Sequence, residues 1–442
     1  MPDDRSIQPR KAPMEIAAPR CYTVAPRIHT PVAIRTLLPH ALCCVHAEAD
    51  SEPKHSLKVY ADAEGVVRFH IQPSSATHDI ARLEVDYAAN GRLVRYPLRL
   101  RVSLEPTAEM PSPPVEKPLP RRDNVLMRPG LSFDEAMHLT DEEALARGYP
   151  LRPNPDEVPK AFNAWLRCVS MPGYRIEPHL VSNPDVTHGK RKQHAPANSS
   201  NWCGFELLRS PVLSPTIGGG ITLSEPYDWV TGTWHVPFVT GEPGIKTYSA
   251  LWVGLDGDGT TDLVQAGTEQ EATNVNLGFI QLTLTNYYAW TEFLPQQPTE
   301  QVITNFTINP GDEILTDVWV GTGDNEPSLS GAYGRFFIMN LSTGGFASLS
   351  TPRAPTSVSG REAVWIMERP TVGGSLPDLA NYGSAVMYNA SARKVNSPRY
   401  KGYVPYLGVR NKQETMVNGA DTLSTVTAID SSSMRFDWKA FN

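Results

Sequence analysis

The sequence predicts an all-β fold in which a small β-domain and a short helical connector precede a large antiparallel β-sandwich. Its 442 residues, 40% of them hydrophobic, can bury substantial cores, and the length favours two or three domains over one. The 40 prolines and 32 glycines indicate short strands joined by tight turns. Turn signals recur at spacings of about eight to twelve residues in the C-terminal part, which is typical of a sandwich.

The chain begins with a terminal stretch and the small β-domain. Residues 1–20 are expected to be disordered, and residues 21–105 to form the β-domain. Asn90 and Gly91 fit the type I′ turn of a β-hairpin. On both sides of this turn apolar residues alternate with polar ones, at Leu83, Val85 and Tyr87 and at Leu98, Leu100 and Val102.

Residues 106–197 are expected to form a proline-rich linker followed by short helices. The first part is dense in proline and charge, which predicts an extended linker. Two helices should start at capping boxes, in which a Ser or Thr precedes a Glu by three residues, at Ser132 with Glu135 and at Thr140 with Glu143. The second should end at Gly148 and Pro150. A third helix is expected around residues 159–169, with Phe162, Trp165 and Leu166 on one face.

The connector ends in a polar, basic run that includes Lys190, Arg191 and Lys192. We favour a solvated loop for these residues, because runs of charge usually lie in water. The alternative is an exposed segment that is open to proteolysis.

Residues 198–442 carry a continuous strand signal and are expected to form the sandwich. Apolar or β-branched residues alternate with other residues in two segments, at Ile280, Leu282 and Leu284 and at Ile314, Thr316 and Val318. The segment STVTAIDSSSMRFDW predicts a closing hairpin near the C-terminus.

The distribution of histidine restricts the chemistry of this region. Ten of the eleven histidines precede residue 197, and the region from Asn198 onward retains only His235 and Cys203. A Ser/His/Asp triad needs a base beside an activated hydroxyl, and catalytic zinc needs about three protein ligands. No Gly-x-Ser-x-Gly, His-Glu-x-x-His, Asp-Thr-Gly or Asp-Ser-Gly occurs. Chemistry in this region must therefore use carboxylates and amides.

Metals, nucleic acids and membranes are not expected to be partners. DGDGTTD, which starts at Asp256, lacks the Gly and Glu that an EF-hand needs at loop positions 6 and 12 and predicts a tight turn, so we expect no metal and no cofactor. The region from Asn198 carries 14 Lys and Arg against 23 Asp and Glu, which disfavours binding to phosphate. Neither an apolar signal-peptide segment nor an 18-residue apolar stretch is visible.

Five motifs in this region resemble the eqolisins, the glutamic peptidases, over about residues 198–442. In order they are SNWCG, TGTWHVP, SALWVGLDGDGTTDLVQAG, YYAWTEFLP and REAVWIMERP. The resemblance implies a concanavalin A-like sandwich of two antiparallel sheets with a catalytic Gln/Glu pair, and Gln265 and Glu368 match those positions. It also implies that Asp256 and Glu292 orient the pair, and that Trp202 and Trp252 line the substrate groove.

Strand alternation is compatible with this assignment. Leu263, Gln265 and Gly267 should share one face of their strand, and Glu368 should share a face with Val364 and Ile366. The sequence departs from the fungal relatives in lacking their cysteine pair near the Asp-Gly turn and in having Arg369 and Pro370 after the glutamate. The relatives are extracellular, whereas no signal peptide is visible here, so localisation stays open.

The resemblance implies an endopeptidase that hydrolyses polypeptides at acidic pH. Glu368 would act as general base and then acid, while Gln265 would orient the water and stabilise the oxyanion. We expect a monomer with polypeptide substrates. Two alternatives are a carbohydrate-binding sandwich that uses Trp202, Trp252 and Trp290, and a glycosidase that uses Glu292 and Glu368. If the peptidase interpretation holds, the connector is a candidate propeptide that masks the groove and is removed in acid near residues 188–200.

Overall fold

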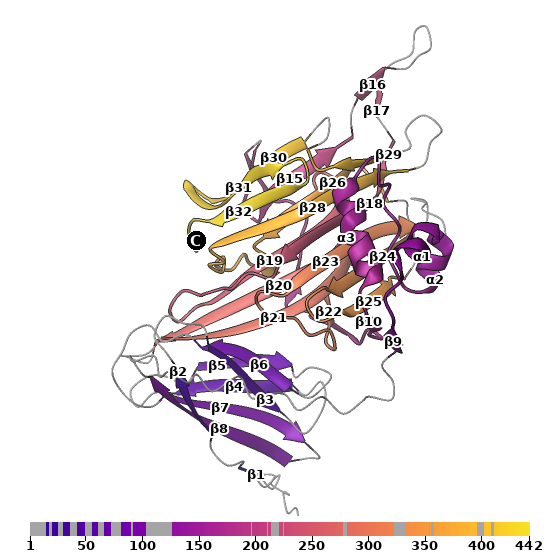
Figure 1. The fold of residues 1–442 in the computed structure, drawn as a ribbon. Helices are drawn as coiled ribbons and strands as arrows, with labels where there is room; N and C mark the ends of the chain where they lie inside the picture. The colour runs from indigo at the N-terminus through magenta and orange to yellow at the C-terminus, as the bar shows by residue number, and fades with distance from the viewer. Residues whose placement is uncertain are drawn as a thin grey trace, which may run out of the picture. The chain divides into compact units, whose positions relative to one another are not determined.

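A computed structural model gives the fold of the chain (Figure 1). From residue 126 onward it describes all residues except 196, 210, 214–220, 224, 277–280, 322–331, 353, 355–357, 396–401 and 408–410, and before residue 126 it describes only strands β1 to β8. The chain divides into two compact units. Unit 1 comprises residues 1–115 and 273–284, and unit 2 comprises residues 116–272 and 285–442. The domain boundaries drawn from the sequence stay a prediction.

Unit 1 contains a six-stranded sheet in the order β1–β8–β7–β4–β5, in which β2 also pairs with β8, and a separate pair of β3 with β6. The strands are β1 (Glu15–Ile16), β2 (Arg20–Val24), β3 (Thr30–Arg35), β4 (Leu42–Glu48), β5 (His55–Tyr60), β6 (Val66–Ile71), β7 (Ala81–Ala89) and β8 (Arg92–Val102). Strands β7 and β8 pair antiparallel with Ala89 opposite Arg92, which confirms the expected hairpin. Its turn residues Asn90 and Gly91 lie outside the described residues, while β1 falls within the stretch expected to be disordered.

Unit 2 is built around two mainly antiparallel sheets that share β30. The site sheet has the order β11–β22–β21–β20–β19–β26–β15–β30. Its strands are β11 (Leu180–Ser182), β15 (Trp202–Leu208), β19 (Lys246–Asp256), β20 (Leu263–Asn276), β21 (Gln281–Leu294), β22 (Gln301–Ile303), β26 (Glu362–Glu368) and β30 (Asn411–Asn418). The ends of β20 and β21 at residues 273–276 and 281–284 belong to unit 1.

The helix-side sheet has the order β9–β10–β25–β24–β23–β18–β28–β32–β31–β30–β14–β13, with β29 paired to β28. Its other strands are β9 (Leu126–Arg128), β10 (Gly173–Arg175), β13 (Gln193–Ala195), β14 (Asn198–Ser199), β18 (Tyr227–His235), β23 (Glu313–Gly321), β24 (Tyr333–Asn340), β25 (Gly345–Ser350), β28 (Ser384–Lys394), β29 (Gly402–Pro405), β31 (Asp421–Asp430) and β32 (Ser433–Trp438). Two short pairs are β12 (Val186–Thr187) with β27 (Thr371–Val372) and β16 (Pro211–Leu213) with β17 (Ile221–Leu223).

The main apolar core lies between these sheets and includes Val253, Trp365, Val318 and Phe336. This architecture confirms the predicted β-sandwich, and the pairing of β31 with β32 confirms the closing hairpin. The alternation at residue 280 cannot be compared, because Ile280 and the side chain of Leu282 lie outside the described residues.

Both predicted capping boxes are present in the connector. Helix α1 (Phe133–His138) begins after Ser132, whose hydroxyl accepts the N–H of Glu135 at 3.2 Å while the Glu135 carboxylate accepts the N–H of Ser132 at 2.8 Å. Helix α2 (Asp141–Ala146) begins after Thr140 with the same exchange to Glu143. Gly148 follows α2 with φ 75°, a conformation that favours glycine.

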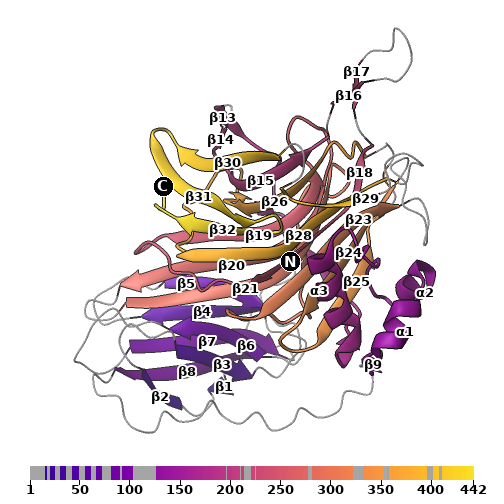
Figure 2. The same ribbon diagram turned by 45° about the horizontal axis from the view of Figure 1, so that its top comes forward.

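The third helix packs on the outer face of the helix-side sheet. Helix α3 (Pro159–Ser170) buries Phe162 and Trp165 and half-buries Leu166, as expected. These side chains join a second apolar cluster with residues of β18, β23, β24 and β25, among them Trp229, Leu315, Phe337 and Phe346. Helices α1 to α3 therefore lie against the sandwich (Figures 1 and 2). None of the described helices is long and apolar enough to span a bilayer.

Candidate active site

Strand alternation places the predicted pair on one face of the site sheet. Val264 and Ala266 of β20 and Trp365 and Met367 of β26 point into the core between the sheets. Their neighbours point to the opposite face, where an apolar cluster contains Trp202, Trp252, Leu263, Val364 and Ile366. Gln265 and Glu368 continue the second set, so the expectation that they share a face is confirmed.

Strand β19 lies between the two strands that carry Gln265 and Glu368. Ala250 of β19 is the register partner of Glu368, and Gly254 lies beside Gln265. A Cβ atom at Gly254 would lie 2.9 Å from the carbonyl oxygen of Val264 and 3.1 Å from the Cβ of Gln265. Glycine therefore permits the close approach of β19 and β20 beside the amide.

Three side chains surround the Glu368 carboxylate. Trp252 donates its indole N–H to Oε2 at 2.9 Å, and Asn201 donates to Oε1 at 3.3 Å. The third is His188, whose Nδ1 lies 3.2 Å from Oε2. Burial raises the pKa of Glu368, and the hydrogen bonds from His188, Trp252 and Asn201 offset part of that rise.

The Gln265 amide binds one predicted neighbour and one unexpected group. Its Nε2 donates to Glu292 Oε2 at 2.9 Å and to the carbonyl oxygen of His188 at 2.5 Å. Its Oε1 makes no hydrogen bond with any residue that the structure describes. These hydrogen bonds indicate that the NH₂ group of Gln265 faces the peptide carbonyl of His188. Glu292 lies beside the amide, as the resemblance implied.

The remaining predicted residues have different surroundings. Trp202 donates its indole N–H to the carbonyl oxygen of Gly189 at 3.0 Å and packs edge-on against Trp252. Asp256 accepts the backbone N–H groups of Gly360 and Arg361 at 2.7 and 2.6 Å. It therefore fixes the turn that precedes β26, and a role in orienting the pair stays a prediction for it.

A segment of the connector covers this face of the site sheet. Residues 183–192, called the strap here, include β12, which pairs with β27. On the other side of His188, the carbonyl oxygens of Gly189 and Lys190 accept from the side-chain amide of Asn201 at 3.4 and 3.2 Å. Gln265 and Glu368 are both 0% exposed. They contact the strap directly on the face away from the core.

His188 is the functional candidate that the sequence did not reveal. Its ring stacks on Trp290 with centroids 3.4 Å apart and planes 5° from parallel. Its Nε2 lies 3.0 Å from Glu300 Oε2 and 3.6 Å from Glu269 Oε2. Burial alone would lower the pKa of His188, but hydrogen bonds with Glu300 and Glu368 raise it well above the usual value.

The carboxyls around this ring are themselves perturbed. Burial raises the pKa of Glu269 well above its usual value, with an opposing contribution from His188. Glu292 behaves in the same way, and its Oε2 also accepts the backbone N–H of His188 at 3.0 Å. The ring of His188 therefore stands among four glutamates when the strap is in place.

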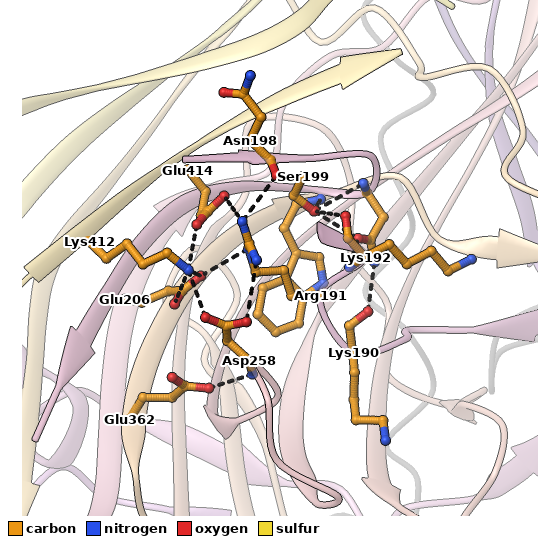
Figure 3. A network of polar contacts seen from close by, with 12 residues as sticks. Lys190, Arg191, Lys192, Asn198, Ser199, Glu206, Asp258, Glu362, Lys412 and Glu414 are labelled. Carbon is orange, nitrogen blue, oxygen red and sulfur yellow. Dashed lines mark hydrogen bonds and ion pairs between the residues drawn. The ribbon is translucent and has the colours of Figure 1, made fainter. Parts of the chain in front are cut away.

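Arg191 anchors the C-terminal end of the strap in an ionic network (Figure 3). Its guanidinium lies 2.9 Å from Glu414, 3.4 Å from Asp258 and 3.8 Å from Glu206. The Arg191 side chain is only 2% exposed. The interpretation of residues 190–192 as a solvated loop is therefore wrong for Arg191, because its partners come from distant strands, whereas Lys190 and Lys192 are exposed.

The same network contains a group of carboxylates close enough to bind a metal ion. Oxygens of Glu206, Asp258 and Glu362 lie within 4.8 Å of one another. Lys412 contacts two of them, at 3.2 Å from Glu206 and 2.7 Å from Asp258. Lys412 and Arg191 thus supply positive charge to Glu206 and Asp258.

Comparison with known proteins decides the family. Residues 215–437, half of the chain, match the family model described as Peptidase A4 family. The chain belongs to the peptidase A4 family. It is therefore a peptide-bond hydrolase of the glutamic type, as the five motifs implied. Gln265, Glu292 and Glu368 fall inside the matched range, whereas His188, Asn201 and Trp202 precede it.

Individual relatives of this peptidase share moderate identity with it. Aspergillopepsin-2 from Aspergillus niger is 27% identical over 227 residues, which cover 48% of this chain and 73% of that protein. Two crystal structures of scytalido-glutamic peptidase, both with transition-state analogues, are each 20% identical, with a TM-score of 0.40. Each alignment covers 54% of this chain and 98% of that one.

Proposed function

We propose that this peptidase is an acid-acting endopeptidase in which Glu368 activates water and Gln265 stabilises the oxyanion. One observation carries the proposal. The carbonyl oxygen of His188 accepts a hydrogen bond from Gln265, while the ring of the same residue contacts Glu368. A peptide bond thus lies at the two side chains that would have to cleave it.

The chemistry follows from the groups that meet there. Glu368 removes a proton from water, whose oxygen adds to the carbonyl carbon of the substrate. The N–H of Gln265 lies where negative charge develops on the carbonyl oxygen. The protonated Glu368 then delivers its proton to the leaving nitrogen. The amide of Gln265 is neutral at any pH, so Glu368 is the only titrating member of the pair.

The connector is proposed to be a propeptide that keeps the peptidase latent. The strap covers Gln265 and Glu368 and is pinned on both sides of His188, by β12 on one side and by Arg191 on the other. Other peptides cannot reach the pair while it stays. The charge of Asp258, which helps to hold Arg191, is lost in acid, which favours release of the strap and cleavage of the connector within residues 188–200.

Degradation of an unfolded protein tests the activity directly. Purified full-length protein is incubated with casein at pH 3 to 5 and at pH 7, and new amino termini are quantified. We expect hydrolysis after a lag in acid and none at pH 7. The proposal fails if casein stays intact across this range, or if the Glu368→Gln variant degrades it as fast as the wild type.

A further inference from the structure

We infer that the pocket holding the His188 ring is the subsite for the residue that supplies the scissile carbonyl, and that this subsite selects histidine. The inference rests on the proposed function. It predicts that the peptidase prefers histidine at this subsite. It also predicts that the peptidase cleaves its own connector at the His188–Gly189 bond.

The backbone of the strap is placed as a substrate would be. The N–H of His188 donates to Glu292 at 3.0 Å, and its carbonyl oxygen accepts from Gln265 at 2.5 Å. The next carbonyl, of Gly189, accepts from Trp202 at 3.0 Å. Of the strap carbonyls, the one at the Gln265 amide belongs to His188, so the bond presented to the pair is His188–Gly189.

The pocket for the side chain is flat on one side and acidic at its end. Trp290 stacks against the ring over its full face, with planes 5° from parallel. Glu300 accepts at Nε2 at 3.0 Å and is held in turn by the hydroxyl of Tyr288 at 2.8 Å. Glu269 lies 3.6 Å from the same nitrogen, and neither of its oxygens has a hydrogen bond with the described residues. All of these side chains are buried.

This combination favours an imidazole over other side chains. A planar ring is needed to stack on Trp290, and an N–H donor at the far end of the ring is needed by Glu300 Oε2. Phenylalanine offers the first without the second and would leave Glu300 Oε2 without this donor. Lysine and glutamine offer a donor without the ring. Histidine is cationic in the acidic range and meets both requirements.

Cleavage of the strap itself would be an ordinary hydrolysis. The oxygen of water bonds to the carbonyl carbon of His188, and the bond from that carbon to the nitrogen of Gly189 breaks. Glu368 passes one proton from water to this nitrogen, which leaves a carboxylic acid on His188, carrying the other proton of water, and a new amino terminus at Gly189. In the latent form the ring Nδ1 lies 3.2 Å from Glu368 Oε2, so the pinned strap occupies an oxygen that the water needs.

Matched peptides test the preference. The full-length protein is activated at pH 3 and then given, at pH 4, three internally quenched peptides based on DVTHGKRK, with His, Phe or Gln at the histidine position. We expect kcat/KM for the His peptide to exceed the other two by roughly 10-fold or more, because charge-assisted hydrogen bonds are lost in each. Mass spectrometry should place the cut after histidine, and the processed protein should begin at Gly189.

A pair of variants ties the preference to the pocket. In Glu300→Gln the ratio of the His to the Phe peptide should fall at least fivefold, whereas the surface control Glu142→Gln should keep the wild-type ratio. Equal cleavage of the His and Phe peptides by the wild type overturns the inference while the peptidase assignment stands, and this holds even if Glu300→Gln does not fold. Failure of the wild type to cleave any peptide or casein would instead refute the proposed function.

Discussion

At the scale of single residues, the sequence predicted the pair of Gln265 and Glu368 but not the residue that contacts both of them, His188. Gln265 and Glu368 lie in strands with clear alternation, so their common face followed from a period of two. His188 carries no such signal, because its position depends on the path of the strap across the site sheet. The nearest hint was the polar run just before the first motif. Asn201 lies inside that motif, and nothing in the surrounding sequence indicated that its side chain would contact Glu368.

Removal of either member of the pair should abolish hydrolysis without unfolding the protein. Glu368→Gln nearly preserves shape and eliminates the base, so the rate on casein at pH 4 should fall about 100-fold or more. Gln265→Ala should have a comparable effect through loss of the oxyanion donor. Circular dichroism checks that the sheets persist. A folded variant that retains more than about a tenth of the wild-type rate would contradict the assigned role.

At the scale of elements, predictions succeeded where the signal is local. The capping boxes of α1 and α2 depend on residues three apart, and the structure has both. The contacts of the strap could not be predicted in the same way, because Asp258 and Glu414, which bind Arg191, lie far along the chain. A run of charge is indistinguishable from a solvated loop until those partners are known.

The strap should detach as the pH falls below about 4. Burial alone would raise the pKa of Asp258, but Lys412 and Arg191 lower it below the ordinary value. Its stabilising contribution is therefore present above the ordinary pKa of about 3.9 and is lost as pH falls through the lowered one. The raised pKa of His188 has the opposite sign, since its contribution is present in acid and is lost as the pH rises through the raised value. Acid release must therefore come from Asp258 at Arg191. Burial raises the pKa of Glu206 to about 8 and also raises those of Glu269, Glu292 and Glu368, so protonation of these buried carboxyls in acid favours the closed strap.

Hydrogen exchange of the Glu368→Gln variant measures this release without self-cleavage. We expect amide groups in residues 183–192 to be protected at pH 6 and to exchange freely at pH 3, after correction for the intrinsic rates. Protection that is unchanged at pH 3 would show that acid does not free the strap.

Arg191 should set the stability of the latent form. Arg191→Gln removes one of the two cations at Glu414 and leaves Lys412, 2.6 Å away, as its remaining partner, and breaking a buried ion pair costs up to about 3–5 kcal/mol. The variant should therefore show earlier activation, at higher pH and with a shorter lag, in the casein assay. Lys190→Gln is the matched control, because Lys190 is the exposed neighbour of Arg191 in the same segment. Identical lag times for the two variants would show that Arg191 does not hold the strap in place.

At the scale of the whole molecule, the connector is part of the structure of unit 2. Helices α1 to α3 share an apolar cluster with the helix-side sheet, and β10 and β11 pair with β25 and β22. These contacts lie before residue 188. A cut in residues 188–200 therefore breaks the chain without removing the surface that holds the helices.

Trp165 should contribute strongly to this attachment. Its side chain is 2% exposed, and its indole N–H donates to the carbonyl oxygen of Pro150 at 3.0 Å. Trp165→Ala should lower the free energy of unfolding by about 3–5 kcal/mol, as measured by urea denaturation at pH 7. Leu166→Ala, at the half-buried neighbour, should cost clearly less. Similar losses for the two variants would contradict the packing described here.

The central claim is that the pair formed by Gln265 and Glu368 is latent under the strap and frees itself in acid. The most direct measurement is to acidify purified full-length protein to pH 3 and to sequence the amino terminus of the products over time, beside the Glu368→Gln variant. The wild type should be cut within residues 188–200 before activity on casein appears, and the variant should stay whole. Full-length protein that remains intact while fully active on casein would contradict the claim.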